Sequence, residues 1–278
     1  MTSDAWELAH RAATAAGVEL RPLASLDDAD RIVHVLERTW GGEQVVPREM
    51  IRALAESGNV PFGAFAGGDL VGYVLGWIGA GPAREIHVHS HMLATLPDRR
   101  HHGVGYALKL AQRAQAADLG IGAIRWTFDP LVARNAHLNL HKLGTVIDRF
   151  ERSFYGEMRD ELNRGDRSDR FFVRWDVDRS PGPRPIRPGV AETVLARDDA
   201  GRPVRHDAQG DVALIEIPED HATMRSSDPE LARRWRDEVA ETAELVLGRG
   251  LVGLAFLRER GAYVFGPEPG AGSGGPSA

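Results

Sequence analysis

The chain has 278 residues, of which 42% are hydrophobic, so it is long enough to bury a sizeable core in one large or two smaller globular domains. A net charge of −6 and a pI near 6.0 argue against a nucleic-acid-binding protein, whose basic surface usually shows in the total charge. The absence of cysteine excludes disulfides, thiolate metal sites and a cysteine nucleophile.

Neither a membrane span nor a signal peptide is expected. No apolar run approaches the roughly 18 residues that a span requires. The N-terminal stretch MTSDAWELAH lacks the basic-then-apolar layout of a signal peptide. We therefore expect a soluble, cytoplasmic protein with no membrane partner and no nucleic-acid partner.

The first half of the chain alternates between helical and strand-like spacing of apolar residues. The run Ser25-Leu26-Asp27-Asp28 is a helix N-cap, and Gly67-Gly68 forms a tight turn between two strands. The expected helices cover residues 4–16, 25–40, 47–56, 104–118 and 133–143, and the expected strands cover residues 18–23, 60–66, 70–78, 84–96 and 121–128. This order predicts a mixed α/β layer in which strands 84–96 and 121–128 are parallel neighbours.

The segment from Arg100 to Gly105 is the most informative motif, because its R-x-x-G-x-G pattern lies between a strand and a helix. Such a turn exposes backbone N–H groups that have no helical partner, and the positive end of the helix dipole points the same way. The segment is therefore a candidate phosphate site. The alternative is an ordinary loop-to-helix turn.

This order of elements around R-x-x-G-x-G resembles the GNAT acyltransferase superfamily over about residues 18–176. The run WTFDPLVARNAHLNLHKLG, residues 126–144, is similar to a branch of that superfamily with a long C-terminal extension. The resemblance implies a GNAT-like α/β fold, here with a small C-terminal α/β extension, that binds acetyl-CoA or another acyl-CoA as co-substrate and uses no metal. The implied coenzyme A site comprises Leu93, Ala94, Thr95, Arg100, His101, His102, Gly103, Val104, Gly105 and Tyr106. In it the residues from 100 onward line the phosphates, and Leu93 to Thr95 pair with the pantetheine arm as with an added strand.

One feature departs from the family pattern. Counting back from Gly144 places Leu140 where many GNAT proteins carry a tyrosine that protonates the departing thiolate. Tyr155 or Tyr106 could supply a hydroxyl instead, and we assign Tyr155 to the catalytic set. The alternative for both is a structural tyrosine.

Three histidines alternate along the strand before the motif. Period-two alternation puts His87, His89 and His91 on one face, with Ile86, Val88, Ser90 and Met92 on the other. His89 lies roughly where some GNAT enzymes carry a glutamate, so His89 and His91 are candidate general bases. A metal site and a polar strand face satisfied by its neighbours are the alternatives.

The strand 121–128 ends in candidate substrate-binding residues. Trp126 and Phe128 would wall the acceptor pocket, and Asp129 or Arg134 would orient the amine or the carboxylate of the acceptor. The alternative for the two aromatic residues is the core. Glu43 and Gln44 are weaker candidates.

The last third is organised around a linker at residues 179–188, whose sequence RSPGPRPIRP has four prolines. Beyond it, strands are expected at 211–217, 251–257 and 262–265, with a helix at 228–247. The expected domains are an N-terminal helix (1–17), the GNAT-like domain (18–178), the linker, a strand-helix-hairpin subdomain (189–265) and a flexible tail (266–278). The subdomain is expected to pack on the first domain or on a second subunit of a homodimer.

The resemblance implies an N-acyltransferase that moves an acyl group, acetyl by default, directly from coenzyme A to an amine. Deprotonating a lysine-like amine at pH 7 costs about 4.6 kcal/mol, whereas an α-amino group costs about 1.4 kcal/mol. We therefore expect a small amino-acid-like acceptor. Two alternatives are succinyl transfer to an amino acid, with Arg125 or Arg134 contacting the acidic acyl chain, and a non-catalytic acyl-CoA-binding or regulatory module.

Overall fold

A computed structural model describes residues 2–41, 46–81, 84–99, 102–157, 165–186 and 191–268. The chain divides into two compact units. Unit 1 comprises residues 1–126, 159–164 and 176–180, and unit 2 comprises residues 127–158, 165–175 and 181–278. The domain boundaries expected from the sequence remain a prediction.

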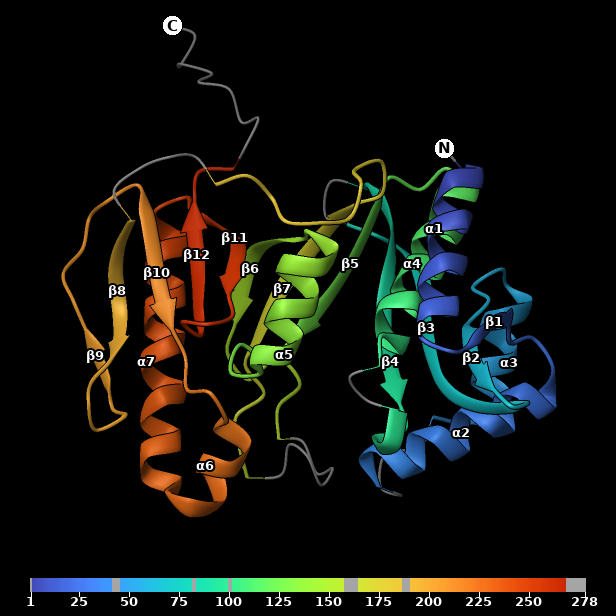
Figure 1. Cartoon of the computed structure of the whole chain (residues 1–278), viewed down its shortest axis with the longest axis horizontal. Coiled ribbons are helices and arrows are strands. Elements are labelled where there is room, and N and C mark those ends of the chain that lie inside the picture. Colours follow the sequence, from blue (N-terminus) through green and yellow to red (C-terminus); the bar gives the residue numbers. More distant parts are fainter. Residues whose placement is uncertain are drawn as a thin grey trace, which may run out of the picture. The chain divides into compact units, whose positions relative to one another are not determined.

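Unit 1 is a sheet with helices on both faces (Figure 1). Its helices are α1 (Thr2–Ala15), α2 (Leu26–Trp40), α3 (Arg48–Glu56), the short 3₁₀ turn η1 (Pro97–Arg99) and α4 (Val104–Asp118). Its strands are β1 (Glu19–Pro22), β2 (Phe62–Ala66), β3 (Asp69–Ala80), β4 (Ile86–Thr95) and β5 (Ala123–Phe128), the last of which continues into unit 2. Every element expected from the sequence in this unit is present, with each end within two residues of the expected position.

The strands of unit 1 follow the order β1-β2-β3-β4-β5. The first four are antiparallel to their neighbours, and β5 is parallel to β4, as the sequence predicts. Helices α1 and α4 pack side by side, while α2 packs against α3 (Figure 1). Ser25 begins α2 with a reciprocal capping box, in which its hydroxyl bonds the backbone N–H of Asp28 and the Asp28 carboxylate bonds the Ser25 N–H.

A β-bulge at His91 breaks the regular alternation of β4. Leu75 pairs with Met92 and Gly76 with Ser90, so His91 is an extra residue opposite β3. The expectation that Met92 lies opposite the histidines is therefore wrong. Met92 shares the face of Tyr73, whose hydroxyl lies 3.9 Å from the Met92 sulfur.

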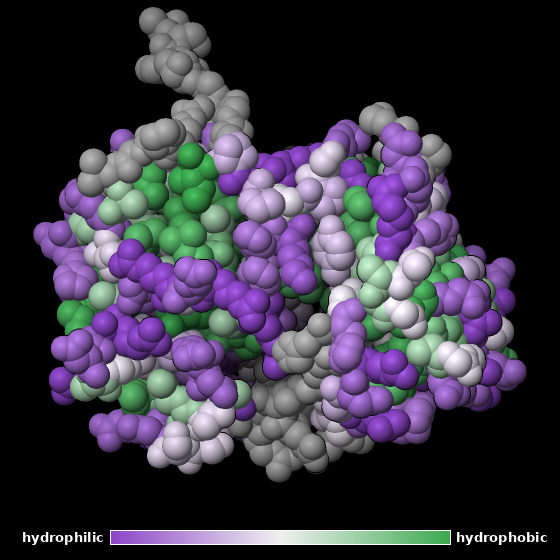
Figure 2. Space-filling view, in the orientation of Figure 1, coloured by the Kyte–Doolittle hydropathy of each residue, from purple (hydrophilic) through white to green (hydrophobic). Residues whose placement is uncertain are grey.

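Unit 2 is built around a second group of strands, in the order β7-β6-β11-β12-β10-β8-β9. The strands are β6 (Val146–Glu151), β7 (Arg170–Asp176), β8 (Ala191–Arg197), β9 (Pro203–Arg205), β10 (Val212–Glu216), β11 (Val252–Leu257) and β12 (Ala262–Gly266). The helices are α5 (Ala133–Ala136), the π-helical turn η2 (His137–Leu143), α6 (His221–Ser227) and α7 (Pro229–Gly248). Figure 2 shows hydrophobic residues over β10 and β12, where Val212, Leu214 and Val264 form a small buried cluster.

The sequence predicted β10, α7, β11 and β12 but missed several other elements of unit 2. Strands β6 to β9 and helix α6 were not expected. The helix expected at 133–143 is α-helical only to Ala136 and then widens into a π-helix that ends at Gly144. No helix in the described part of the chain is long and apolar enough to cross a membrane.

Gly76 is expected to be indispensable to the packing of β3 against β4. A Cβ at this position would lie 2.5 Å from the backbone oxygen of His89 and 2.9 Å from the Gln112 side chain. Gly76→Ala should therefore lower the free energy of unfolding by about 1–3 kcal/mol, because the backbone must move. Gly122→Ala is the matched control, since a Cβ there meets nothing within 4 Å. Equal urea-unfolding midpoints for both variants would contradict the close approach at Gly76.

Candidate active site

Strands β4 and β5 pair only at their beginnings. The paired residues are Val88 with Ile124 and His89 with Arg125, and beyond them β4 continues to Thr95 with pairing to β3 alone among the described strands. The β5-side edge of β4 from Ser90 to Thr95 therefore lacks a strand partner. This stretch of backbone is about 17 Å long at the usual rise per residue.

The start of α4 offers a second set of unpaired backbone groups. Gly103 precedes the helix in the left-handed conformation, with φ 86°, which glycine adopts without strain. The N–H groups of Val104, Gly105 and Tyr106 have no acceptor among the described backbone atoms, because the first internal bond of the helix runs from Ala107 to Gly103.

The two features lie next to each other. A Cβ at Gly105 would lie 3.5 Å from the Leu93 side chain, so the first turn of α4 contacts the open part of β4. His102 is exposed beside this turn, whereas Arg100 and His101 lie outside the described residues. Backbone donors at a helix start suit a phosphate group, and an unpaired strand edge suits an extended chain with amide groups. The residues present therefore fit the diphosphate and the arm of an acyl-CoA.

The histidines of β4 gather against Trp77 on the face shared with Tyr73. His89 and His91 lie 5.0 Å and 4.7 Å from the Trp77 ring between centroids, and His87 lies against Gly79 on the same face. The predicted common face is thus confirmed. Within the described residues, no group of three His, Cys, Asp or Glu side chains could hold a metal ion.

The surroundings of the histidines favour their neutral forms. Burial, and then the nearby His91, His87 and Lys109, lower the pKa of His89 to about 4. Desolvation also lowers the pKa of His91, which is the more exposed of the two. Both imidazoles are therefore unprotonated at neutral pH and able to accept a hydrogen bond or a proton.

A buried lysine of α4, which the sequence pattern did not single out as functional, contacts the opposite face of β4. Lys109, on α4, donates a hydrogen bond of 2.7 Å to the Ser90 hydroxyl, and its ammonium lies 3.6 Å from the centroid of the Trp126 ring. Trp126 is buried, as in the alternative that assigned it to the core. The sequence signal for this lysine was that it is the one charged residue in the otherwise apolar run Tyr106–Ala111 of an amphipathic helix.

Two predicted substrate-binding residues, Phe128 and Arg134, and the predicted catalytic residue Tyr155 lie in unit 2. Phe128 is buried against Phe171. Tyr155 is exposed, with its hydroxyl 3.3 Å from the Thr127 hydroxyl. Arg134 is exposed at the start of α5. At the position of the family tyrosine, Leu140 is completely buried.

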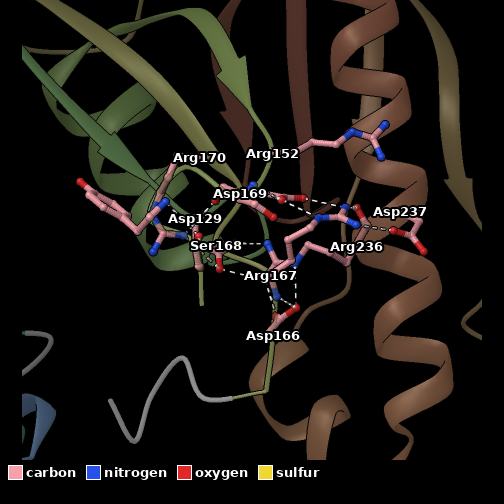
Figure 3. A network of polar contacts seen from close by, with 12 residues as sticks. Asp129, Arg152, Asp166, Arg167, Ser168, Asp169, Arg170, Arg236 and Asp237 are labelled. Carbon is pink, nitrogen blue, oxygen red and sulfur yellow. Dashed lines mark hydrogen bonds and ion pairs between the residues drawn. The ribbon is translucent and has the colours of Figure 1, made fainter. Parts of the chain in front are cut away.

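Asp129 belongs to a network of charged residues in unit 2 (Figure 3). Arg236 of α7 holds both oxygens of the Asp129 carboxylate, at 2.7 Å and 2.9 Å, and also bonds Asp166. Burial raises the pKa of Asp129, but the charge and the hydrogen bonds of Arg236 outweigh it, so the pKa lies below its ordinary value. This carboxylate is thus engaged within the protein, through a partner 107 residues away that no local sequence pattern could reveal.

Asp129→Asn should destabilise unit 2 by about 2–3 kcal/mol, because it leaves the buried Arg236 guanidinium with Asp166 as its remaining carboxylate partner. The control is Glu241→Gln on the same helix, whose exposed pair with Arg205 should change stability by less than about 1 kcal/mol. Thermal and urea unfolding measure both. A fully stable Asp129→Asn protein would show that the network does not hold the unit together.

Comparison with known proteins places residues 29–144 in the Acetyltransferase (GNAT) family. Three similar solved structures are yncA from Salmonella typhimurium with its cofactor acetyl-CoA, a GNAT-family acetyltransferase from Streptococcus pneumoniae, and the ribosomal-protein-S18-alanine N-acetyltransferase from Escherichia coli. Their sequence identities to the chain are 15%, 19% and 12%, with TM-scores of 0.47, 0.46 and 0.44. They cover 61%, 56% and 59% of this chain, which covers 99%, 98% and 96% of theirs. None of the curated proteins compared with the chain matches it.

The matched segment runs from α2 to the end of η2 and includes β4, the start of α4 and the beginning of β5. The unpaired strand edge and the open helix start both lie inside it. Residues 29–144 of the chain therefore form a domain of the GNAT acetyltransferase family.

Proposed function

We propose that this protein is an acyl-CoA-dependent N-acyltransferase of the cytoplasm, which moves an acetyl group directly to the amine of a small amino-acid-like acceptor. The observation that carries the proposal is the open backbone edge of β4, from Ser90 to Thr95, beside the open start of α4. This arrangement provides donors for a diphosphate and a strand edge for an amide-containing arm. The family match to acetyltransferases supports it.

The residues that would hold coenzyme A act mainly through their backbone. Val104, Gly105 and Tyr106 would donate N–H groups to the phosphates, and Leu93 to Thr95 would bond the arm. A backbone amide that bonds a charged oxygen contributes about 1.5–3 kcal/mol, whereas an exposed charge contact contributes about 0–1 kcal/mol. The bound co-substrate supplies the activated acyl thioester.

The histidines of β4 would handle the proton of the attacking amine. The face shared by His89 and His91 carries neutral imidazoles, and a neighbouring strand amide could stabilise the developing oxyanion. An α-amino group near pKa 8 requires little help at neutral pH, which favours an amino acid over a protein lysine as the acceptor. Tyr155 remains a predicted hydroxyl donor, and the acceptor pocket remains a prediction as well.

A non-catalytic acyl-CoA-binding module is the second candidate function, because the buried Leu140 replaces the usual proton donor. Thiol release with a panel of amines distinguishes the two. An enzyme releases coenzyme A in proportion to acylated amine, whereas a binding module retains the thioester. Comparison of acetyl-CoA with succinyl-CoA in the same assay identifies the preferred acyl group.

A negative charge in the first turn of α4 should weaken coenzyme A binding without weakening the helix. Gly105→Glu adds a carboxylate where the dipole favours it, so the melting temperature should stay within a few degrees of wild type. The same carboxylate repels the diphosphate, and the Kd from calorimetry should rise about 10- to 100-fold. Gln115→Glu, near the far end of α4, is the control and should bind normally. Equal affinity of both variants would rule out the helix start as the phosphate site.

The pH dependence of kcat/KM should follow the deprotonation of the acceptor amine rather than the titration of the histidines. With the pKa of His89 at about 4, kcat/KM for an α-amino acid should rise with pH as the acceptor loses its proton near pH 8, with no inflection at 6.5. His89→Gln and His91→Gln should each lower kcat/KM about 100-fold, whereas His87→Gln should not. If turnover survives unchanged in both of the first two variants, the histidines are not the bases.

A further inference from the structure

Lys109 occupies the point at which β4 and β5 separate. His89 and Arg125 form the last pair between the two strands, and the next residue on each strand is Ser90 and Trp126. The Lys109 ammonium contacts both of these side chains and bridges the two diverging strands from the α4 side. Lys109 is 3% exposed, which is rare for a lysine without a carboxylate partner.

The described part of the chain provides no carboxylate for this lysine. Its only polar partner there is the Ser90 hydroxyl, and the titratable neighbour on β4 is His89, whose pKa it helps to lower. Burial lowers the pKa of Lys109 itself well below its ordinary value. The ammonium is therefore a stronger acid than that of a solvated lysine.

Ser90 and Lys109 lie on the side of β4 where the proposed reaction needs a proton donor for the leaving sulfur. Ser90 faces α4, on the same side of β4 as Leu93 and the first turn of the helix. His89 and His91 lie on the opposite face. An acyl-CoA bound along the open edge of β4 from the start of α4 would extend toward Ser90, where β4 and β5 begin to separate. Its leaving sulfur requires a proton there, and Leu140 cannot provide one.

We propose that Ser90 and Lys109 form a proton relay that protonates the leaving thiolate, with Ser90 as the catalytic residue and Lys109 as the residue that recharges it. This inference rests on the proposed function. As the carbon–sulfur bond breaks, the Ser90 hydroxyl gives its proton to the sulfur and takes one from the Lys109 ammonium. The amine left on Lys109 regains a proton from solvent. The net result is one S–H bond formed and one proton taken from water.

The experiment compares two donors that differ in how much their leaving group needs a proton. Ser90→Ala and Lys109→Met should each lower the rate of acyl transfer from acetyl-CoA about 100-fold, with calorimetric affinity for coenzyme A unchanged. Transfer from acetyl-seleno-coenzyme A, whose selenol is far more acidic, should fall less than threefold. Equal losses with both donors would show that the two residues only support the fold.

A second readout uses the protein without any ligand. Titration of Lys109 under the Trp126 ring should produce a pH-dependent fluorescence transition in the wild type that is absent from Lys109→Met. A transition that persists in Lys109→Met would overturn the assignment of a titrating lysine. Full activity of both variants with acetyl-CoA would overturn the relay and leave the proposed function intact. No thiol release by the unmodified protein with any amine would contradict both.

Discussion

The proposed site depends on the separation of β4 from β5 after only two matched pairs of residues, Val88 with Ile124 and His89 with Arg125. Backbone N–H and C=O groups that face no partner must be satisfied by water or by a ligand, and edges of this kind are rarely left exposed in sheets. Here the open edge runs from Ser90 to Thr95 and ends beside the start of α4. The open edge of β4 and the open start of α4 thus border one surface. An acyl-CoA bound there would be held by main-chain groups rather than by particular side chains.

The bulge at His91 organises the chemistry on the two faces of β4. Because one extra residue is inserted, His91 and Met92 are both brought toward the face of Trp77, while Ser90 and Leu93 face α4. Proton acceptors for an amine and a proton donor for a thiolate would therefore be separated by the thickness of one strand. Separation of this kind allows an acid and a base to keep different protonation states at the same pH.

The sequence allowed the fold of unit 1 to be predicted because its boundaries are marked by local chemistry. Ser25 caps α2 and Gly103 precedes α4, whose bounds agree with the prediction. The bulge at His91 has no local signal in the sequence, so the prediction of the face on which Met92 lies was wrong. The partner of Asp129 could not be predicted either, because Arg236 lies 107 residues further along the chain and only tertiary packing joins them. Lys109 was visible as a lone charge in an apolar run, but its contacts with two strands were not.

Hydrogen–deuterium exchange of the β4 and α4 amides, with and without coenzyme A, tests the central claim most directly. Without ligand, the amides of residues 90–95 that face away from β3 and the amides of residues 104–106 should exchange rapidly. Saturating coenzyme A should slow both groups together and leave β2 unchanged. Slow exchange of these amides in the free protein, or no protection on addition of coenzyme A, would contradict an open strand edge that receives the co-substrate.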